Sequence, residues 1–271
     1  MIVDDKGIKD SWKEYMEKLM NEENVWDHKI SAGVKEGPAD CIRRAKVRAV
    51  LKKMKRHKAA GLSGLVAEMI QAAWDTGTQW LLDLCNGIVK EGCIPEDWKS
   101  SVVIPIYKGK GDPMECGSYR GIKLLEHAMK VAEKIFEHRI RQQIETDDMQ
   151  FRFMIGKGTT DAIFMARQIF RVKSKKLYFG FVDLEKALDR VLREVISWAM
   201  RKLGVEEWLV SAVMSVYTGA KTIVRTVYGN SKGFEVKVGM HQGSASSPLL
   251  FVIVMEAMGP FSKLLKKILG K

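Results

Sequence analysis

Hydrophobic residues recur every three or four positions in several long stretches of the chain, and this spacing places them on one face of an α-helix. The pattern predicts helices over 12–19, 39–54, 65–89, 125–136 and 193–203. Gly204 directly follows the last of these, where a residue with left-handed backbone often ends a helix. Much of the chain is therefore expected to be helical.

Short apolar runs between turn residues predict strands at three places. A β-rich run covers 102–107, and a compact apolar run covers 178–182 and ends at Asp183. The segments 222–228 and 234–238 are typical of a hairpin, because apolar and charged residues alternate in the second. Helices mixed with short strands predict an α+β fold.

Composition narrows the class of protein further. The 271 residues are 46% hydrophobic and carry a net charge of +12, which favours a polyanionic partner such as nucleic acid. No apolar run approaches the roughly 18 residues that cross a bilayer, so no membrane partner is expected. The four cysteines lack metal-ligand spacing and no secretory signal is visible, so we expect an intracellular protein, with nucleus or cytoplasm left open.

Positive charge is concentrated in the predicted helix 39–54, which has no acidic residue after Asp40. This surface allows two interpretations: a solvated helix face, or a surface that contacts nucleic-acid phosphates. The candidate nucleic-acid-binding residues are Arg43, Arg44, Lys46 and Arg48.

Two other segments have candidate chemistry, each with a structural alternative. Asp183 ends an apolar strand, a position that holds a carboxylate rigidly enough to bind a divalent cation, although the local sequence alone favours a solvated strand-end Asp. The segment 240–248 contains Gln, Gly and Ser before a buried run, which suits close approach of backbone to a ligand. It also suits an ordinary loop with Ser246 or Ser247 as helix N-cap and Pro248 at the first helical position.

Taken in order, five segments resemble the reverse transcriptase of non-LTR (LINE-type) retrotransposons. The resemblance runs from about His57 to Met258. The segments are His57-Lys58-Ala59-Ala60-Gly61, Ser118-Tyr119-Arg120-Gly121-Ile122-Lys123-Leu124-Leu125, Asp161-Ala162-Ile163, Phe181-Val182-Asp183-Leu184-Glu185-Lys186-Ala187, and His241-Gln242-Gly243 with Ser247-Pro248.

The resemblance implies a right-hand polymerase fold with fingers and a partial palm, preceded by a helical N-terminal region. Its implied divisions are a helical basic leader at 1–56, a partial reverse transcriptase domain at 57–258, and a non-family basic tail at 259–271. The implied partners are an RNA and DNA template–primer and a nucleoside triphosphate, and the implied cofactor is Mg²⁺. The oligomeric state and the preferred nucleic acid stay open.

The resemblance also implies roles for particular residues. Asp183, through its carboxylate, and Leu184, through its backbone carbonyl, match the positions that bind metal, and Asp183 matches a catalytic residue. The implied nucleotide-binding residues are Lys108, Lys110, Arg120, Leu188, Gln242 and Gly243. The guanidinium of Arg120 suits phosphate oxygens because it can form two parallel hydrogen bonds.

The sequence departs from the family at its third catalytic element. That element is an aromatic-Ala-Asp-Asp turn, and no Ala-Asp-Asp occurs in these 271 residues. One carboxylate and one carbonyl cannot balance two dications, so we expect a C-terminally truncated pseudoenzyme without thumb or activity.

Smaller departures indicate drift in a decayed element. Leu188 stands where the family has an aromatic, Arg152 where it has Gly, and Ala245-Ser246 where it has an apolar pair. Two alternatives remain: a non-enzymatic basic RNA- or DNA-binding module, and a translated pseudogene product that folds poorly.

Overall fold

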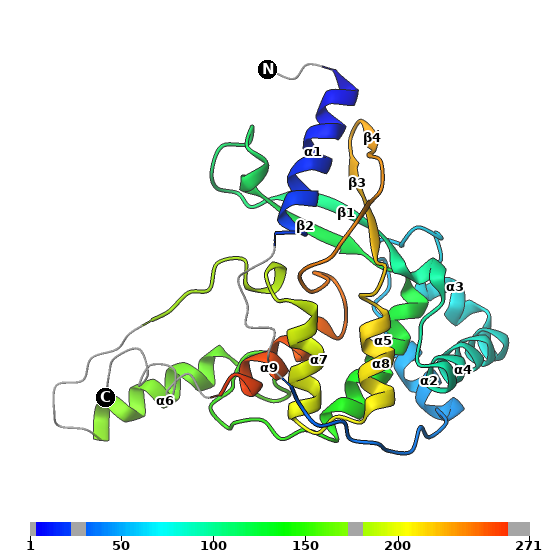
Figure 1. The fold of residues 1–271 in the computed structure, drawn as a ribbon, viewed down its shortest axis with the longest axis vertical. Helices are drawn as coiled ribbons and strands as arrows, with labels where there is room; N and C mark the ends of the chain where they lie inside the picture. Colours follow the sequence, from blue (N-terminus) through cyan, green and yellow to red (C-terminus); the bar gives the residue numbers. More distant parts are fainter. Residues whose placement is uncertain (1–3, 23–30, 173–180, 260–271) are drawn as a thin grey trace.

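The computed structural model describes residues 4–22, 31–172 and 181–259. A small sheet lies between helix α1 and a larger body of helices, and α6 extends away from that body (Figure 1). The helices are α1 (Asp5–Leu19), α2 (Arg44–Lys52), α3 (Ala67–Ala72), α4 (Trp74–Glu91), α5 (His127–Arg141), α6 (Thr159–Val172), α7 (Arg193–Lys202), α8 (Glu207–Ser215) and α9 (Ser247–Ala257). Short 3₁₀ turns η1 (Glu96–Lys99), η2 (Cys116–Ser118) and η3 (Ala187–Asp189) connect some of them. The observed mixture of helices and strands confirms the α+β class.

The sheet joins distant parts of the chain. Its strands are β1 (Ser100–Tyr107), β2 (Tyr119–Leu124), β3 (Lys221–Thr226), β4 (Gly229–Asn230) and β5 (Phe234–Glu235). The strand β1 is central, because it pairs antiparallel with β2 and parallel with β3. Both β4 and β5 pair antiparallel with β3, so the predicted hairpin is present, with a second strand of only two residues.

Helix α1 covers one face of this sheet through a small apolar cluster. The Asp4 side chain begins the helix by accepting a hydrogen bond from the Gly7 N–H at 3.2 Å. The cluster consists of Met16, Met20, Val103, Val224, Phe234 and Val236. Complete burial of a side chain such as that of Met16 contributes about 1.5–3 kcal/mol. The N-terminal helix is therefore part of the fold.

The main core lies in the helical body. Helices α2, α4, α5, α7, α8 and α9 contribute its apolar side chains, and Leu81, Ile135, Leu209 and Leu249 are at most 1% exposed. Of the helices in the described ranges, none combines the length and apolar character that crossing a bilayer requires.

All five predicted helices are present with some differences in their bounds, while α6 and α8 were not predicted. The predicted helix 39–54 begins only at Arg44. The predicted helix 65–89 is two helices, α3 and α4, because the chain turns at Trp74, which has φ +45°. Helix α7 ends as predicted: Gly204 has φ +76°, and the Val205 N–H donates to the Met200 carbonyl at 3.0 Å.

The strand predicted over 178–182, before Asp183, is not found at the two of its residues that the structure describes. Residues 178–180 lie outside the described ranges, and Phe181 and Val182 do not belong to a strand. Their side chains are 92% and 60% exposed, so the burial that makes an apolar run form a central strand is absent here. Asp183 thus lies in an irregular segment that does not pair with the sheet.

Candidate functional site

A cavity of about 720 Å³ lies where several separate segments meet; three of them supply most of its lining, and α1 and residues 152–153 complete it. The first comprises β2 and the connection that joins it to β1. The second covers 183–189, and the third is the loop that leads into α9. Its lining includes all eight residues that the resemblance assigned to metal or nucleotide: Lys108, Lys110, Arg120, Asp183, Leu184, Leu188, Gln242 and Gly243. Residues far apart in sequence are thus brought to one site.

The connection between β1 and β2 presents the two lysines. The Lys108 N–H donates to the Ser118 carbonyl at 2.9 Å, and its Nζ donates to the Gly117 carbonyl at 2.8 Å. Gly111 closes this connection with φ +86°, and a Cβ there would lie 2.5 Å from Ser118 Oγ. Lys110 is exposed near the tip, so the hairpin carries its charge over the cavity.

The loop 239–243 is fixed by backbone contacts on two sides. On one side the Lys123 N–H donates to the Gln242 carbonyl at 2.8 Å. On the other, the Met240 N–H donates to the Leu188 carbonyl at 2.8 Å. Gly243 has φ +120°, and a Cβ there would lie 2.4 Å from the Lys123 carbonyl oxygen. Only glycine fits at this close approach.

Buried cations lie behind this loop. Burial and the nearby Arg193 lower the pKa of Lys123 to about 7, while Asp189 acts in the opposite direction. Burial likewise lowers the pKa of Arg193 to about 10. The ring of His241 is buried against Tyr217, and burial, followed by the charges of Lys123 and Arg193, lowers its pKa well below the usual range. Burial behind the loop therefore disfavours the protonated, charged forms of these three groups.

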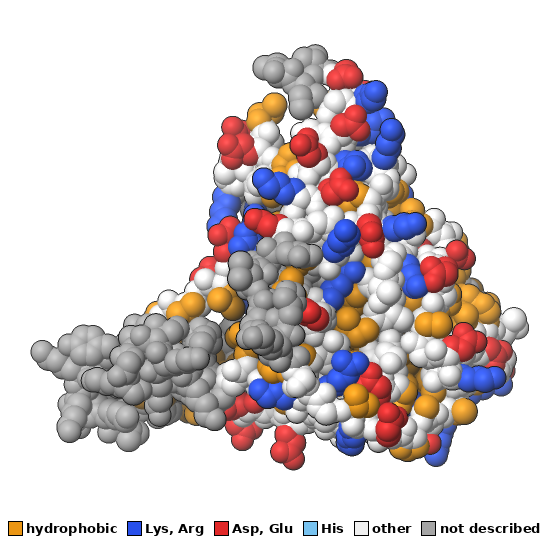
Figure 2. Space-filling view, viewed as in Figure 1, with side chains coloured by type: hydrophobic (Ala, Val, Ile, Leu, Met, Phe, Trp, Pro, Cys, Tyr) orange, Lys and Arg blue, Asp and Glu red, His pale blue; other side chains and the backbone are white. Residues whose placement is uncertain are grey.

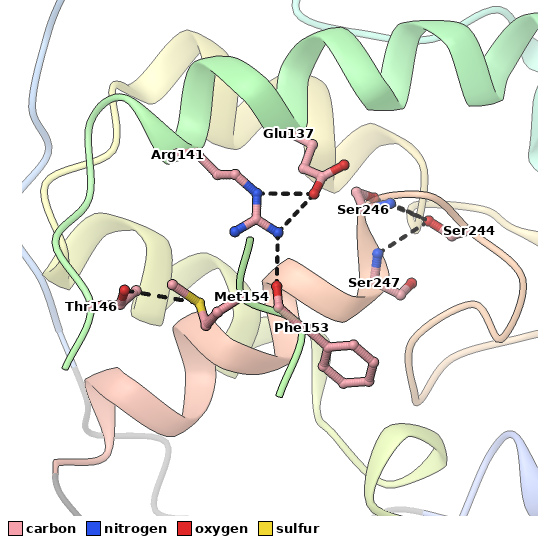
Figure 3. A network of polar contacts seen from close by, with 8 residues as sticks. All are labelled: Glu137, Arg141, Thr146, Phe153, Met154, Ser244, Ser246 and Ser247. Atoms are coloured by element: carbon pink, nitrogen blue, oxygen red, sulfur yellow. Dashed lines mark hydrogen bonds and ion pairs between the residues drawn. The ribbon is translucent and has the colours of Figure 1, made fainter. Parts of the chain in front are cut away.

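Ser244 and Ser246 form hydrogen bonds to a buried acid, Glu133. Oε1 of Glu133 accepts hydrogen bonds from Ser244 Oγ at 2.5 Å and Ser246 Oγ at 3.3 Å, and Oε2 accepts from the Ala245 N–H at 3.0 Å. Burial raises the pKa of Glu133, and these hydrogen bonds oppose that shift. Ser244 Oγ also accepts from the N–H groups of Ser246 and Ser247, at 3.1 and 3.3 Å (Figure 3).

These contacts change the interpretation of two local predictions. Ser246 is the N-cap residue of α9, but its side chain forms no capping hydrogen bond. Its hydroxyl instead donates to Glu133 on α5, so the polar residue at this departure from the family has a structural partner. Pro248 is the second residue of α9, one position later than predicted.

Arg152 is a site residue that the sequence pattern did not predict. Arg152 lines the cavity, and its guanidinium lies 4.8 Å from the centre of the Phe153 ring. Arg141 on α5 holds this segment by donating to the Phe153 carbonyl at 3.1 Å and pairing with Glu137 (Figure 3). The departure from Gly at position 152 was the available signal, because it adds a cation to the cavity.

A two-metal site does not fit the described residues. Asp183 and Glu185 are exposed in the cavity lining, whereas Asp189 accepts hydrogen bonds from Gln242. Within 4–22, 31–172 and 181–259, no group of three or more His, Cys, Asp or Glu side chains is arranged to hold a metal ion. Two adjacent dications need more carboxylates than Asp183 supplies.

The candidate nucleic-acid-binding residues divide between two surfaces. Arg44 and Arg48 form ion pairs with Asp75 on α4. Arg43 and Lys46 line a second cleft, of about 770 Å³. Other residues that line this cleft are His138 and Arg139 on α5 and Trp208 on α8, and the Arg139 guanidinium lies 5.1 Å from the Trp208 ring centre.

The excess positive charge does not gather in one patch on the face seen in Figure 2, where basic and acidic side chains are interspersed around α1 and the neighbouring strands. Charge is more one-sided in the first cavity, whose cationic residues are Lys108, Lys110, Arg120, Arg152 and Lys186. Its acidic residues are Asp183, Glu185 and Asp189. This balance favours an anionic ligand.

Residues 106–267 match the model of the family described as reverse transcriptase (RNA-dependent DNA polymerase). The match covers more than half of the chain, includes all eight cavity residues that the resemblance assigned to metal or nucleotide, and continues into the segment expected as a non-family tail. The chain therefore belongs to the reverse transcriptase family.

Its relatives identify the branch of that family. The chain is 29% identical over 209 residues to a putative 115 kDa protein in type-1 retrotransposable element R1DM of Drosophila melanogaster, covering 76% of the chain and 20% of that protein. It is 29% identical over 234 residues to a Pol polyprotein from element R1 of Bradysia coprophila, covering 81% of the chain and 21% of that protein. It is 27% identical over 223 residues to the RNA-directed DNA polymerase from mobile element jockey of Drosophila funebris, covering 80% of the chain and 24% of that protein.

The family match and these similarities show that the chain is a reverse transcriptase domain of the non-LTR (LINE-type) retrotransposon kind, as the ordered motifs predicted. The chain spans about a fifth of the length of these curated relatives.

Proposed function

We propose that the first cavity binds a nucleoside triphosphate beside a nucleic-acid template. Lys108, Lys110 and Arg120 would bind the phosphates, because ammonium and guanidinium groups form charge-assisted hydrogen bonds to phosphate oxygens. Gln242 and Gly243 would lie against the nucleoside, with Leu188 at the sugar. The observation that carries this proposal is the convergence of these residues on one cavity of about 720 Å³.

In this proposal the sheet and helices form part of a right hand. The β1–β2 hairpin acts as fingers over the triphosphate, and the segments 183–189 and 239–258 belong to an incomplete palm. The proposed divisions of the chain are a basic leader at 1–56, a partial reverse transcriptase domain at 57–258 and a basic tail at 259–271. Support comes from the hairpin's position at the cavity and from the close backbone contacts between the two palm segments.

We further propose that these 271 residues do not catalyse DNA synthesis by themselves. RNA-directed DNA polymerase activity is named for a relative, and it needs metal-bound carboxylates. Asp183 and the Leu184 carbonyl would contribute to a Mg²⁺ site, but they lack the two carboxylates of an Ala-Asp-Asp turn.

Primer extension tests this second part. With an RNA template, DNA primer and Mg²⁺ or Mn²⁺, the purified chain should give no product above background. Product that disappears in Asp183→Ala would overturn the proposal of inactivity.

The triphosphate site is tested by equilibrium binding of a fluorescent deoxynucleoside triphosphate with template–primer present. Arg120→Ala should weaken binding about tenfold, the loss expected when one charge-assisted contact of about 1.4 kcal/mol is removed. Lys90→Ala, at the solvent-exposed end of α4, is the matched control for loss of one charge and should bind like the unaltered chain. Equal affinity of all three proteins would refute the site.

A second candidate function is a non-enzymatic RNA- or DNA-binding module, in which Arg43, Arg44, Lys46 and Arg48 contact phosphates. The second cleft favours it, because Arg43 and Lys46 lie there beside the stacked pair Arg139 and Trp208. The basic residues of this cleft outnumber its acidic ones, Asp40 and Glu206. A basic cleft with an aromatic ring suits a single strand, whose bases stack on aromatic rings.

Filter binding across a salt series tests this module. The double variant Arg43→Ala/Lys46→Ala should lower the slope of log K against log salt by roughly two, about one for each phosphate contact. Arg44→Ala/Arg48→Ala is the matched comparison and should lower it less, because Asp75 already pairs with both arginines. Equal slopes in the double variants and the unaltered chain would exclude the surface.

The remaining alternative is a product that folds poorly. The buried cores in the described ranges instead favour a cooperative thermal unfolding transition. A broad transition without a folded baseline would support the alternative.

A further inference from the structure

Asp189 contacts the proposed nucleotide loop directly. It lies in the η3 turn, in the same cavity-lining segment as Asp183, and is half-buried. The Gln242 Nε2 atom lies 2.6 Å from Asp189 Oδ1 and 2.7 Å from Oδ2. Because an ionised carboxylate only accepts hydrogen bonds, the Gln242 amide must turn its NH₂ group toward Asp189.

The backbone of the loop does not depend on this contact. Two other hydrogen bonds hold it, from Lys123 N–H to the Gln242 carbonyl and from Met240 N–H to the Leu188 carbonyl, both 2.8 Å long. The Asp189 carboxylate therefore acts on the Gln242 side chain. With the NH₂ group engaged, the side-chain carbonyl oxygen is the polar atom of Gln242 left for a ligand.

Two opposing effects act on the Asp189 carboxyl group. Burial raises its pKa, while the hydrogen bond from Gln242 and the charges of Lys123, Lys186 and Lys108 oppose that shift. In either protonation state at least one carboxyl oxygen can accept a hydrogen bond from the Gln242 amide. The sequence pattern indicated no role for Asp189, because Gln242 is 53 residues away.

We propose that Asp189 is a positioning residue: it fixes the Gln242 carboxamide so that its carbonyl oxygen accepts a hydrogen bond from the bound nucleotide. This inference rests on the proposed triphosphate site. It predicts that the two side chains act as a unit, so that removal of either has nearly the same effect as removal of both.

The test is a double-mutant cycle on the full chain with template–primer. Asp189→Ala and Gln242→Ala should each weaken binding of a fluorescent deoxynucleoside triphosphate by about five- to tenfold, and the double variant should be no weaker than Gln242→Ala. Asp189→Asn should recover most of the affinity, because its carbonyl oxygen can still accept from Gln242. Losses that multiply in the double variant, or unchanged affinity in Asp189→Ala, would overturn the inference.

A second measurement separates this inference from the nucleotide site itself. In protein labelled with ¹⁵N-glutamine, the side-chain amide signal assigned by its loss in Gln242→Ala should shift in Asp189→Ala and return toward its original position in Asp189→Asn. If the unaltered chain binds no triphosphate, the proposed function fails. The inferred role at a nucleotide fails with it, and a shifted amide signal would then support orientation of Gln242 alone.

Discussion

Replacing Gly243 with alanine probes the closest backbone approach at the cavity. A φ of +120° costs a residue with a Cβ about 1–3 kcal/mol. The added Cβ would also lie 2.4 Å from the Lys123 carbonyl oxygen, a backbone atom that cannot rotate away. If the loop moves, the hydrogen bond between Lys123 N–H and the Gln242 carbonyl is lost, at about 1 kcal/mol. We expect Gly243→Ala to lower the free energy of unfolding by about 2–4 kcal/mol.

Gly229→Ala is the matched control, because Gly229 has φ +108° and no atom lies within 4 Å of the position that an added Cβ would take. It should show the backbone cost alone. Urea unfolding of both variants gives the comparison, and Gly243→Ala should lose at least about 1 kcal/mol more. Triphosphate binding should weaken only in Gly243→Ala. Equal losses of stability would refute the close approach at Lys123.

Three further variants test the charges and polar pairs around the cavity. Because the pKa of Lys123 is lowered to about 7, the unfolded chain binds more protons between about pH 7 and 10.5. The free energy of unfolding should therefore rise with pH across that window, by up to about 1.4 kcal/mol per pH unit. In thermal scans from pH 7 to 9, Lys123→Met should not show this rise. Parallel plots of stability against pH for the two proteins would contradict the prediction. Glu133→Ala should lower the free energy of unfolding by about 2–4 kcal/mol in urea, because Ser244, Ala245 and Ser246 lose their buried acceptor; a loss below about 1 kcal/mol would count against this. Arg152→Gly should weaken triphosphate binding about threefold by removing a cavity cation, while unchanged affinity would exclude a role for Arg152.

Local structure was predictable where one face of an element is buried. The spacing in 193–203 identified α7, and Gly204 marked its end, because helix periodicity and positive φ are properties of adjacent residues. The break at Trp74 was not predictable from spacing. It depends on packing between α3 and α4, where Gly77 has room only for hydrogen: a Cβ there would lie 2.4 Å from the Ile70 carbonyl oxygen.

Several residues that line the cavity were named by the sequence motifs, whereas their polar contacts were not. Ordered motifs named Gln242 and Arg120, and both line the cavity. The pairs Gln242–Asp189 and Ser246–Glu133 join residues distant in sequence, and no local pattern encodes such pairs. Asp183 is present at the cavity, while the strand predicted to hold it is not found at residues 181–182.

Photo-crosslinking with an azido-derivatised deoxynucleoside triphosphate tests the central claim most directly. With template–primer present, peptide mapping should place the adducts in 108–122, 183–189 and 241–248, the cavity-lining segments that contain the proposed nucleotide-binding residues. Unlabelled triphosphate should compete, and Arg120→Ala should reduce the yield. Competed adducts confined to other parts of the chain, such as the second cleft, would contradict the assignment of this cavity as the nucleotide site.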